Sequence, residues 1–306
     1  MKAVRFDHYG GPEVLEVRDV ERPVPAAGEV LVQIKAAGIN PGEIAIREGY
    51  LHERFPATFP SGEGTDLAGI VVELGPGVGE LATGDEVLGW TERRASHAEF
   101  VAVPAEWLTP KPAGMSWEVA GSLFVAGLAA YACVDATEPS AGETVVVSGA
   151  AGGVGSVAVQ LARLSGASVI GLASEPNHAW LRSRDIVPVT YGDGQAERIL
   201  WAADGRVDAF IDTFGGGYVA LALDELHVPK ERINTIADFE AIATLGVGGA
   251  GTHSIASAGV LAALAGHVAA GRVEITIAKT YPLARVREAF GELAKRKTHG
   301  KIVLVP

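Results

Sequence analysis

A cluster of glycines between two apolar segments is the feature of this chain with the clearest chemical meaning. The run GAAGGVG at residues 149–155 follows the apolar segment ETVVVS at 143–148 and opens the segment SVAVQLARL at 156–164, which has helical spacing. Glycines in such a turn let the backbone come close to a diphosphate, whose charge is met by free N–H groups and the positive end of the helix dipole. Because the run lies between a predicted strand and a predicted helix, it predicts a dinucleotide-binding loop rather than a purely structural turn.

The residues after the next predicted strand indicate which dinucleotide is bound. Enzymes that use NAD place an acidic residue there to accept the ribose hydroxyls, whereas an acid would repel the 2′-phosphate of NADP. Here the segment SVIGLA at 168–173 is followed by Ser174, which can donate to a phosphate, with His178 and Tyr191 as neighbours. This pattern favours NADPH. Glu175 leaves NADH open, because its carboxylate would select that coenzyme if it turned into the site.

The elements around the glycine run predict an α/β fold with a doubly wound parallel sheet. The stretches 143–148, 154–164 and 168–173 read as strand, helix and strand, which is one β-α-β unit. Two further segments, VDAFID at 207–212 and RINTIA at 232–237, look buried on both faces, as the strands of a parallel sheet are. Strands that alternate with helices in this way are typical of a Rossmann domain.

The remainder of the chain predicts a second, β-rich domain. Up to about residue 112, short β-branched runs are separated by Gly and Pro clusters, which favours a Gly-rich β barrel or meander. A length of 306 residues makes two domains the prior expectation. We therefore predict a first domain over 1–115, completed by the strand-rich tail 272–306, and a nucleotide-binding domain over 116–271.

Composition and charge exclude several classes of protein. The net charge of −12 at pH 7 repels a nucleic-acid backbone. The longest apolar stretch, 123–134, is too short to span a bilayer, and the N-terminus has no apolar signal segment, so we expect a cytoplasmic protein without a membrane partner. Cys133 is the only cysteine, which excludes an intramolecular disulfide and a thiolate zinc cluster.

With these features the chain resembles, nearly end to end, the zinc-free quinone oxidoreductase (zeta-crystallin-like) branch of the medium-chain dehydrogenases/reductases. The segments that carry the resemblance are AAGINP at 36–41, GTDLAG at 64–69, GDEV at 84–87, AGL at 126–128, AAGGVG at 150–155 and GKIVL at 300–304. The resemblance implies a GroES-like catalytic domain plus a Rossmann domain, with the nicotinamide in a cleft between them. It also implies a homodimer.

Zinc is excluded by the ligands that this chain lacks. Zinc members of the superfamily have a Cys at the position of Asn40 and a His at the position of Thr65, and their structural zinc needs four cysteines after the position of Val87. Without a Lewis acid to stabilise an alkoxide, alcohol oxidation is disfavoured, whereas an electrophilic quinone or enone accepts hydride with less assistance.

The resemblance also implies the residues that contact the cofactor. These are Ala150, Gly152, Gly153 and Val154 at the diphosphate, Ser174, His178 and Tyr191 at the adenosine phosphate, and Phe214, Ile236 and Asp238 near the nicotinamide half. The family commonly has Lys where His178 stands, which weakens the choice of NADPH over NADH.

Fewer residues are candidates for catalysis than for cofactor binding. By resemblance Asn40 lies near the nicotinamide and the substrate, although Asn before Pro41 also suits a turn cap. Tyr50 can donate the proton that completes enone reduction, unless it is an ordinary surface-loop residue. Glu43 and Arg47, four residues apart, are predicted to form an exposed helical pair without a catalytic role.

The sequence therefore predicts an NADPH-dependent, zinc-independent oxidoreductase that delivers hydride to a small quinone or α,β-unsaturated carbonyl. Two alternatives stay open. One is an enoyl reductase that acts on a thioester, and the other is a non-enzymatic NADPH-binding protein with a redox or structural role.

Overall fold

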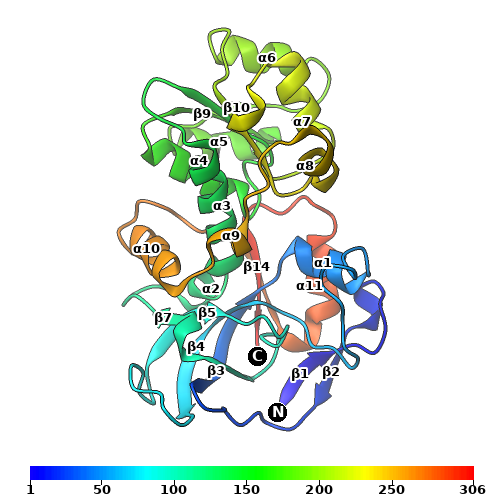
Figure 1. Cartoon of the computed structure of the whole chain (residues 1–306), viewed down its shortest axis with the longest axis vertical. Helices are drawn as coiled ribbons and strands as arrows, with labels where there is room; N and C mark the ends of the chain where they lie inside the picture. Colours follow the sequence, from blue (N-terminus) through cyan, green and yellow to red (C-terminus); the bar gives the residue numbers. More distant parts are fainter. The chain divides into compact units, whose positions relative to one another are not determined.

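Residues 1–306 are all described by a computed structural model, in which they form two units (Figure 1). Unit 1 contains Met1–Val125, Ser257–Ala270 and Thr276–Pro306, and unit 2 contains Ala126–Ala256 and Gly271–Ile275. Each unit has its own sheet and its own core. The domain limits drawn from the sequence, at 115 and 271, stay a prediction.

A five-stranded parallel sheet forms the centre of unit 2. Its strands are β8 (Thr144–Val147), β9 (Ser168–Leu172), β10 (Val187–Val189), β11 (Ala209–Asp212) and β12 (Ile233–Thr235). They are ordered β10-β9-β8-β11-β12, so the chain moves outward from β8 in one direction and then returns to continue on its other side. This order confirms the predicted doubly wound sheet, whose direction changes between β8 and β11.

Helices follow the strands of unit 2. They are α3 (Leu123–Thr137, from Ala126 on in this unit), α4 (Gly155–Leu164), the 3-10 turn η3 (Glu175–Asn177), α5 (His178–Arg182), α6 (Gln195–Ala202), α7 (Tyr218–Ala220), the π turn η4 (Leu221–Glu225), the 3-10 turn η5 (Lys230–Arg232), α8 (Phe239–Leu245) and α9 (Thr252–Ile255). Helix α4 packs on β8 and β9, and α5 and α6 pack on β10.

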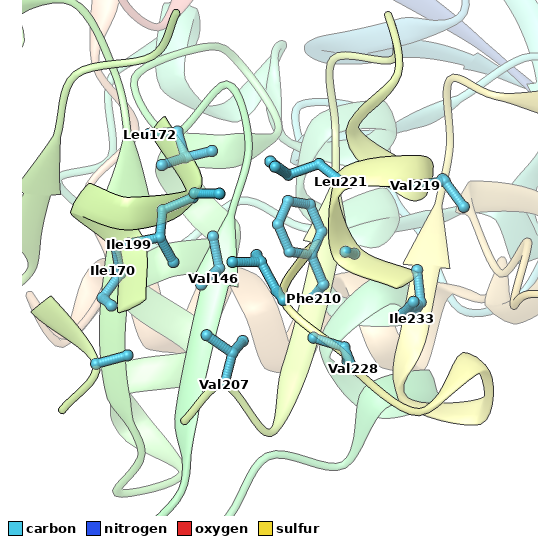
Figure 2. Packing of buried hydrophobic residues seen from close by; sticks show 14 of the residues in the cluster. Val146, Ile170, Leu172, Ile199, Val207, Phe210, Val219, Leu221, Val228 and Ile233 are labelled. Carbon is cyan, nitrogen blue, oxygen red and sulfur yellow. The ribbon is translucent and has the colours of Figure 1, made fainter. Parts of the chain in front are cut away.

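Apolar side chains on one face of this sheet form the core of unit 2. Phe210, from β11, lies among labelled side chains of the neighbouring strands and helices in Figure 2, including Val146 and Leu221. All three are at most 5% exposed. Because Val145, Val146 and Val147 are all fully buried, β8 is covered on both faces, which explains its continuous apolar sequence.

Unit 1 is built mainly on antiparallel strands, and only β13 (Ile277–Pro282) and β14 (Lys301–Val305) pair in parallel. Its large sheet contains β3 (Glu29–Gly38), β4 (Asp66–Leu74), β5 (Glu86–Trp90), β6 (Phe100–Pro104), β7 (Leu108–Pro110), β13 and β14. The order is β13-β14-β3-β4-β5-β7, with β6 also paired to β3, and a separate ribbon joins β1 (Lys2–Arg5) to β2 (Glu16–Asp19). The C-terminal strand β14 therefore lies beside β3, with Val303 opposite Gly38.

Short helices complete unit 1. They are η1 (Pro12–Val14), α1 (Pro41–Arg47), η2 (Ala105–Trp107), α2 (Trp117–Ala120), α10 (Ala258–Ala269), η6 (Leu283–Arg285) and α11 (Val286–Leu293). Helix α11 contributes Phe290 to a core that also contains Phe6 and Leu304. None of the helices in either unit combines the length and the apolar character that crossing a membrane requires.

Truncation of Phe210 tests the core of unit 2. Phe210→Ala removes a fully buried ring and should lower the free energy of unfolding by about 3–5 kcal/mol. Trp201→Ala is the matched control, because this side chain is 88% exposed and its loss should cost less than about 0.5 kcal/mol. Urea denaturation followed by circular dichroism measures both. A cost below about 1 kcal/mol for Phe210→Ala would contradict the packing described.

Candidate functional site

The loop between β8 and α4 is too tight to accommodate side chains at its base. A Cβ atom added to Gly155 would lie 2.1 Å from the carbonyl oxygen of Gly149, a distance that real Cβ atoms do not reach. Gly149 itself has a φ of 58°, and its carbonyl oxygen accepts a hydrogen bond from Gly152 N at 2.8 Å. Glycine at 149 and 155 is therefore a geometric requirement of this turn.

The start of α4 presents uncapped N–H groups at the end of the sheet. Val154, the residue before α4, provides no side-chain cap. The N–H groups of Ser156 and Val157 donate to backbone carbonyls at 3.0 Å, whereas those of Gly153, Val154 and Gly155 make no hydrogen bond within the protein. Ala150 is fully buried and its N–H donates to Leu172 O at 3.1 Å, which ties the loop to the end of β9. An anion can therefore be met by N–H groups and by the helix dipole at this position.

The loops after β9 and β10 contain the residues predicted to choose the coenzyme. Ser174 follows β9, and its Oγ accepts a hydrogen bond from Asn177 Nδ2 at 3.1 Å. His178 begins α5, with Nε2 3.1 Å from the carbonyl oxygen of Ala173. Tyr191, after β10, is 52% exposed, and Glu175 is exposed on the turn that follows Ser174. Both a hydroxyl and a carboxylate are thus available at the end of β9.

The loops after β11 and β12 contain the residues predicted near the nicotinamide half. Phe214 follows β11 and packs edge-on against Tyr218, with ring centroids 6.1 Å apart. Ile236 follows β12, and its N–H donates to Asp212 O at 3.1 Å. Asp238 caps α8, because its Oδ1 accepts the N–H of Ala241 at 2.9 Å. The Asp238 carboxylate is therefore already engaged within the fold.

The predicted cofactor residues of unit 2 thus share one edge of the sheet. Each follows the carboxyl end of a parallel strand, and parallel strands end at the same edge. Their contact with a cofactor stays a prediction. Three further buried polar residues at this edge, Ser148, Asp212 and Thr235, were not predicted from the sequence. Ser148 and Asp212 each end a short apolar segment, which was the available signal, whereas Thr235 lies inside one.

The two candidate catalytic residues lie in unit 1 in different environments. Asn40 precedes α1 and is 4% exposed, with Nδ2 donating to Asp66 Oδ2 at 2.7 Å and Oδ1 accepting from Lys301 Nζ. Tyr50, after α1, is 79% exposed. The Asn40 amide is fully used inside the protein, which fits a residue that fixes the start of α1. A catalytic role for either residue stays a prediction.

The predicted exposed pair of Glu43 and Arg47 is wrong, because α1 turns both side chains inward. Arg47 is fully buried and donates to Glu63 at 2.8 Å, with its guanidinium 4.6 Å from the ring centroid of Phe290. Glu43 instead accepts from Asn40 N at 2.9 Å. Both partners of Arg47 come from distant parts of the chain, so spacing along the helix could not reveal them.

A buried charge cluster results, with more carboxyls than cations. Glu63 pairs with Arg47, and Asp66 lies 3.7 Å from Lys301, so Glu43 is a third carboxyl without a cation of its own. Burial, together with the charges of Glu63 and Asp66, raises the pKa of Glu43 to about 8 against the opposing effects of the Asn40 N–H and of Lys301. Glu43 therefore keeps its proton at neutral pH.

In residues 1–306 no group of three or more His, Cys, Asp or Glu side chains is arranged to hold a metal ion.

This cluster predicts that the free energy of unfolding falls as the pH rises from about 6.5 to about 8. Burial also raises the pKa of Glu63 to about 7, against the attraction of Arg47, so in this range the folded chain keeps protons on Glu43 and Glu63 that the unfolded chain has lost. This stabilisation is complete below pH about 4.5 and is lost as the pH passes the folded pKa values. Burial lowers the pKa of His97 to about 4, so this residue makes the free energy of unfolding rise with pH. That rise is complete by pH about 6.5, below the range in which Glu43 and Glu63 lower the stability.

Urea denaturation across this pH range measures the effect. Glu43→Gln should make the stability profile flatter, because the amide does not titrate. Glu53→Gln, at an exposed position beyond α1, serves as the control and should leave the slope unchanged. A wild-type stability that stays level or rises between pH 6.5 and 8 would show that the cluster does not hold these protons.

Comparison with known proteins agrees with the geometry of both units. Residues 26–138 match the alcohol dehydrogenase GroES-like domain, and residues 185–304 match the zinc-binding dehydrogenase family. A quinone oxidoreductase of Pseudomonas aeruginosa is 30% identical over 329 residues, covering 100% of this chain and 99% of the relative. The chloroplastic NADPH-dependent alkenal/one oxidoreductase of Arabidopsis thaliana is 30% identical over 324 residues, covering 100% of this chain and 80% of the relative. The mouse quinone oxidoreductase is 37% identical over 175 residues, 56% of this chain, and that alignment spans only 52% of the mouse protein.

Solved structures agree over the whole chain. The crystal structure of Escherichia coli quinone oxidoreductase complexed with NADPH superposes with a TM-score of 0.89 at 26% identity and covers 100% of both chains. The quinone oxidoreductase of Coxiella burnetii gives a TM-score of 0.90 at 29% identity, covering 100% of this chain and 99% of that one. The matches confirm the predicted GroES-like and Rossmann folds. The chain belongs to the quinone oxidoreductase family of the medium-chain dehydrogenases/reductases.

Proposed function

We propose that this protein is an NADPH-dependent oxidoreductase that delivers hydride to a quinone or an α,β-unsaturated carbonyl without catalytic zinc. The loop between β8 and α4 carries the proposal. Its base has room for backbone but not for a side chain at Gly155, and an uncapped helix begins there. The loop also lies beside β11, where the strand order reverses, and this is where doubly wound sheets bind dinucleotides.

The role of the protein in this reaction is to bind and orient. The N–H groups of Gly153, Val154 and Gly155 would hold the diphosphate, and Ser174 would donate to the phosphate on the adenosine ribose. A bound reduced dinucleotide supplies the hydride, and a quinone or enone accepts it together with a proton. Positioning of this kind accounts for rate because it makes the reaction effectively intramolecular. Tyr50, with its exposed side chain, is our candidate for the proton donor.

The residues at the positions of the zinc ligands do not suit a metal. The Asn40 amide donates to Asp66 and accepts from Lys301, so it has no oxygen directed to an ion. A threonine hydroxyl at position 65 replaces the imidazole that zinc prefers. We therefore derive no step that passes through a metal.

Relatives support both the coenzyme and the acceptor in this proposal. The Escherichia coli quinone oxidoreductase was solved with NADPH, and the Arabidopsis relative is named for NADPH and for alkenals and enones. The names of the relatives thus include both acceptor classes. The hydroxyl of Ser174 favours NADPH in this chain, and the exposed carboxylate of Glu175 is the feature that opposes it.

An added charge in the glycine loop tests the nucleotide site. Gly153→Asp places a carboxylate where the diphosphate is bound, and like charges this close should weaken NADPH binding by about 100-fold or more. Gly79→Asp makes the same change in net charge at an exposed glycine with no atom within 4 Å of an added Cβ, so it should bind NADPH like the wild type. Isothermal titration calorimetry measures both. Unchanged affinity in Gly153→Asp would place the nucleotide elsewhere.

Turnover tests the reaction itself. The absorbance of the reduced nicotinamide is followed with NADPH or NADH while the protein is offered a simple quinone, a simple enone and a short enoyl thioester. We expect oxidation of NADPH by the quinone or the enone, with NADH used more slowly. Turnover of the thioester alone would identify an enoyl reductase. Tight NADPH binding without turnover of any acceptor would favour a non-enzymatic binding protein.

A further inference from the structure

A buried carboxylate joins three strand ends at the nucleotide edge of unit 2. Asp212 is the last residue of β11 and is fully buried. Its Oδ1 accepts from Ser148 Oγ at 2.6 Å, from Phe214 N at 3.0 Å and from Gly215 N at 2.9 Å. Its Oδ2 accepts from Thr235 Oγ1 at 2.7 Å. All four donors are uncharged, so hydrogen bonds rather than a paired cation compensate the buried charge.

Two of the four donors, Ser148 and Thr235, also accept hydrogen bonds from N–H groups of the loops that follow the strands. Ser148 follows β8 and directly precedes Gly149, and its Oγ also accepts from Thr213 N at 2.9 Å. Thr235 ends β12, and its Oγ1 accepts from Ala237 N and from Asp238 N, both at 3.1 Å. Two N–H groups of the loop after β12 are therefore held by one hydroxyl, whose orientation depends on Asp212, while a third, that of Ile236, donates to the backbone oxygen of Asp212 at 3.1 Å.

The strand order shows which half of a dinucleotide these loops face. The glycine loop follows β8, and the residues suited to the adenosine phosphate follow β9, on one side of β8. A dinucleotide bound across the carboxyl edge extends from the diphosphate in both directions. Its other half must then lie over β11 and β12, where Asp212 and Thr235 fix the loops.

We propose that Asp212 is a positioning residue for the nicotinamide half of the cofactor, acting through Thr235 and through the turn at 214–215. The inference rests on the proposed function, because it requires a bound dinucleotide. Asp212 itself is buried beneath the loops and holds them in the arrangement that the nicotinamide needs.

The chemistry at Thr235 explains why a carboxylate is required. The two lone pairs of Thr235 Oγ1 already accept two N–H groups, so its own proton needs an acceptor, which is Asp212 Oδ2. Asparagine has the same shape and keeps one oxygen for Ser148 and the turn at 214–215. Its NH₂ group, however, would face a hydroxyl that has no free lone pair, so the side-chain hydrogen bond to Thr235 is lost.

Comparing the affinity for the whole coenzyme with the affinity for its adenosine half distinguishes a positioning role of Asp212 from general damage to unit 2. Titration calorimetry is carried out with NADPH and with 2′,5′-ADP, or with NADH and ADP if the wild type prefers NADH. We expect Asp212→Asn to weaken coenzyme binding by at least about 10-fold, as the loss of a buried charge-assisted hydrogen bond does. Affinity for the adenosine half should stay within about two-fold of the wild type.

Three further variants complete the test. Asp208→Asn is the matched control, because this residue lies just before the other end of β11, where its Oδ2 accepts Thr144 N at 2.8 Å, so coenzyme affinity should be unchanged. Thr235→Val removes the hydroxyl and should reproduce the loss seen in Asp212→Asn. Thr235→Ser keeps the hydroxyl and should bind coenzyme like the wild type. If Asp212→Asn does not fold, this Val and Ser pair decides the question.

Two results would overturn the inference while leaving the proposed function intact. One is unchanged coenzyme affinity in Asp212→Asn and Thr235→Val, and the other is equal weakening of coenzyme and adenosine half, which indicates general damage to unit 2. Failure of the wild type to bind either coenzyme would overturn the proposed function as well, so the two failures are distinguishable.

Discussion

The close approach of Gly155 to the carbonyl oxygen of Gly149 is the constraint on which the nucleotide edge of unit 2 depends. A Cβ on Gly155 would lie 2.1 Å from that oxygen, so any other residue would push α4 away from the end of β8. With glycine, the uncapped start of α4 lies directly at the carboxyl edge of the sheet. Because all five strands are parallel, every other loop of the unit that follows a strand begins at this same edge.

Buried polar groups then fix the loops and helix ends that apolar packing leaves free. In unit 2, one carboxylate with four uncharged donors joins the ends of β8, β11 and β12. In unit 1, Asn40 and Asp66 join the start of α1 to β4 and to Lys301 on β14. Burying such groups is unfavourable unless their hydrogen bonds are made, and these hydrogen bonds form only in one arrangement of the backbone. The two clusters therefore fix the positions of the loops and of the start of α1.

The sequence predicted the features that depend on local pattern. The glycine run 149–155 and the apolar segments around it indicated a doubly wound sheet, and the observed strand order confirms it. Features that depend on distant partners were not predictable in this way. Helix α1 was expected to expose Glu43 and Arg47, but Arg47 pairs with Glu63, which lies 16 positions away along the chain. Asp212 looked like the end of an apolar strand, and its partners, 64 and 23 positions away, are brought to it only by the sheet.

We propose above that the carboxyl edge of the sheet in unit 2 binds a nicotinamide dinucleotide. Hydrogen–deuterium exchange of the full chain, measured by mass spectrometry with and without saturating NADPH, locates the bound nucleotide. We expect slower exchange in the loop 149–156 and in the segments after β9, β11 and β12, with no change in the ribbon of β1 and β2. Protection that is absent from the loop 149–156, or confined to another part of the chain, would contradict the proposal.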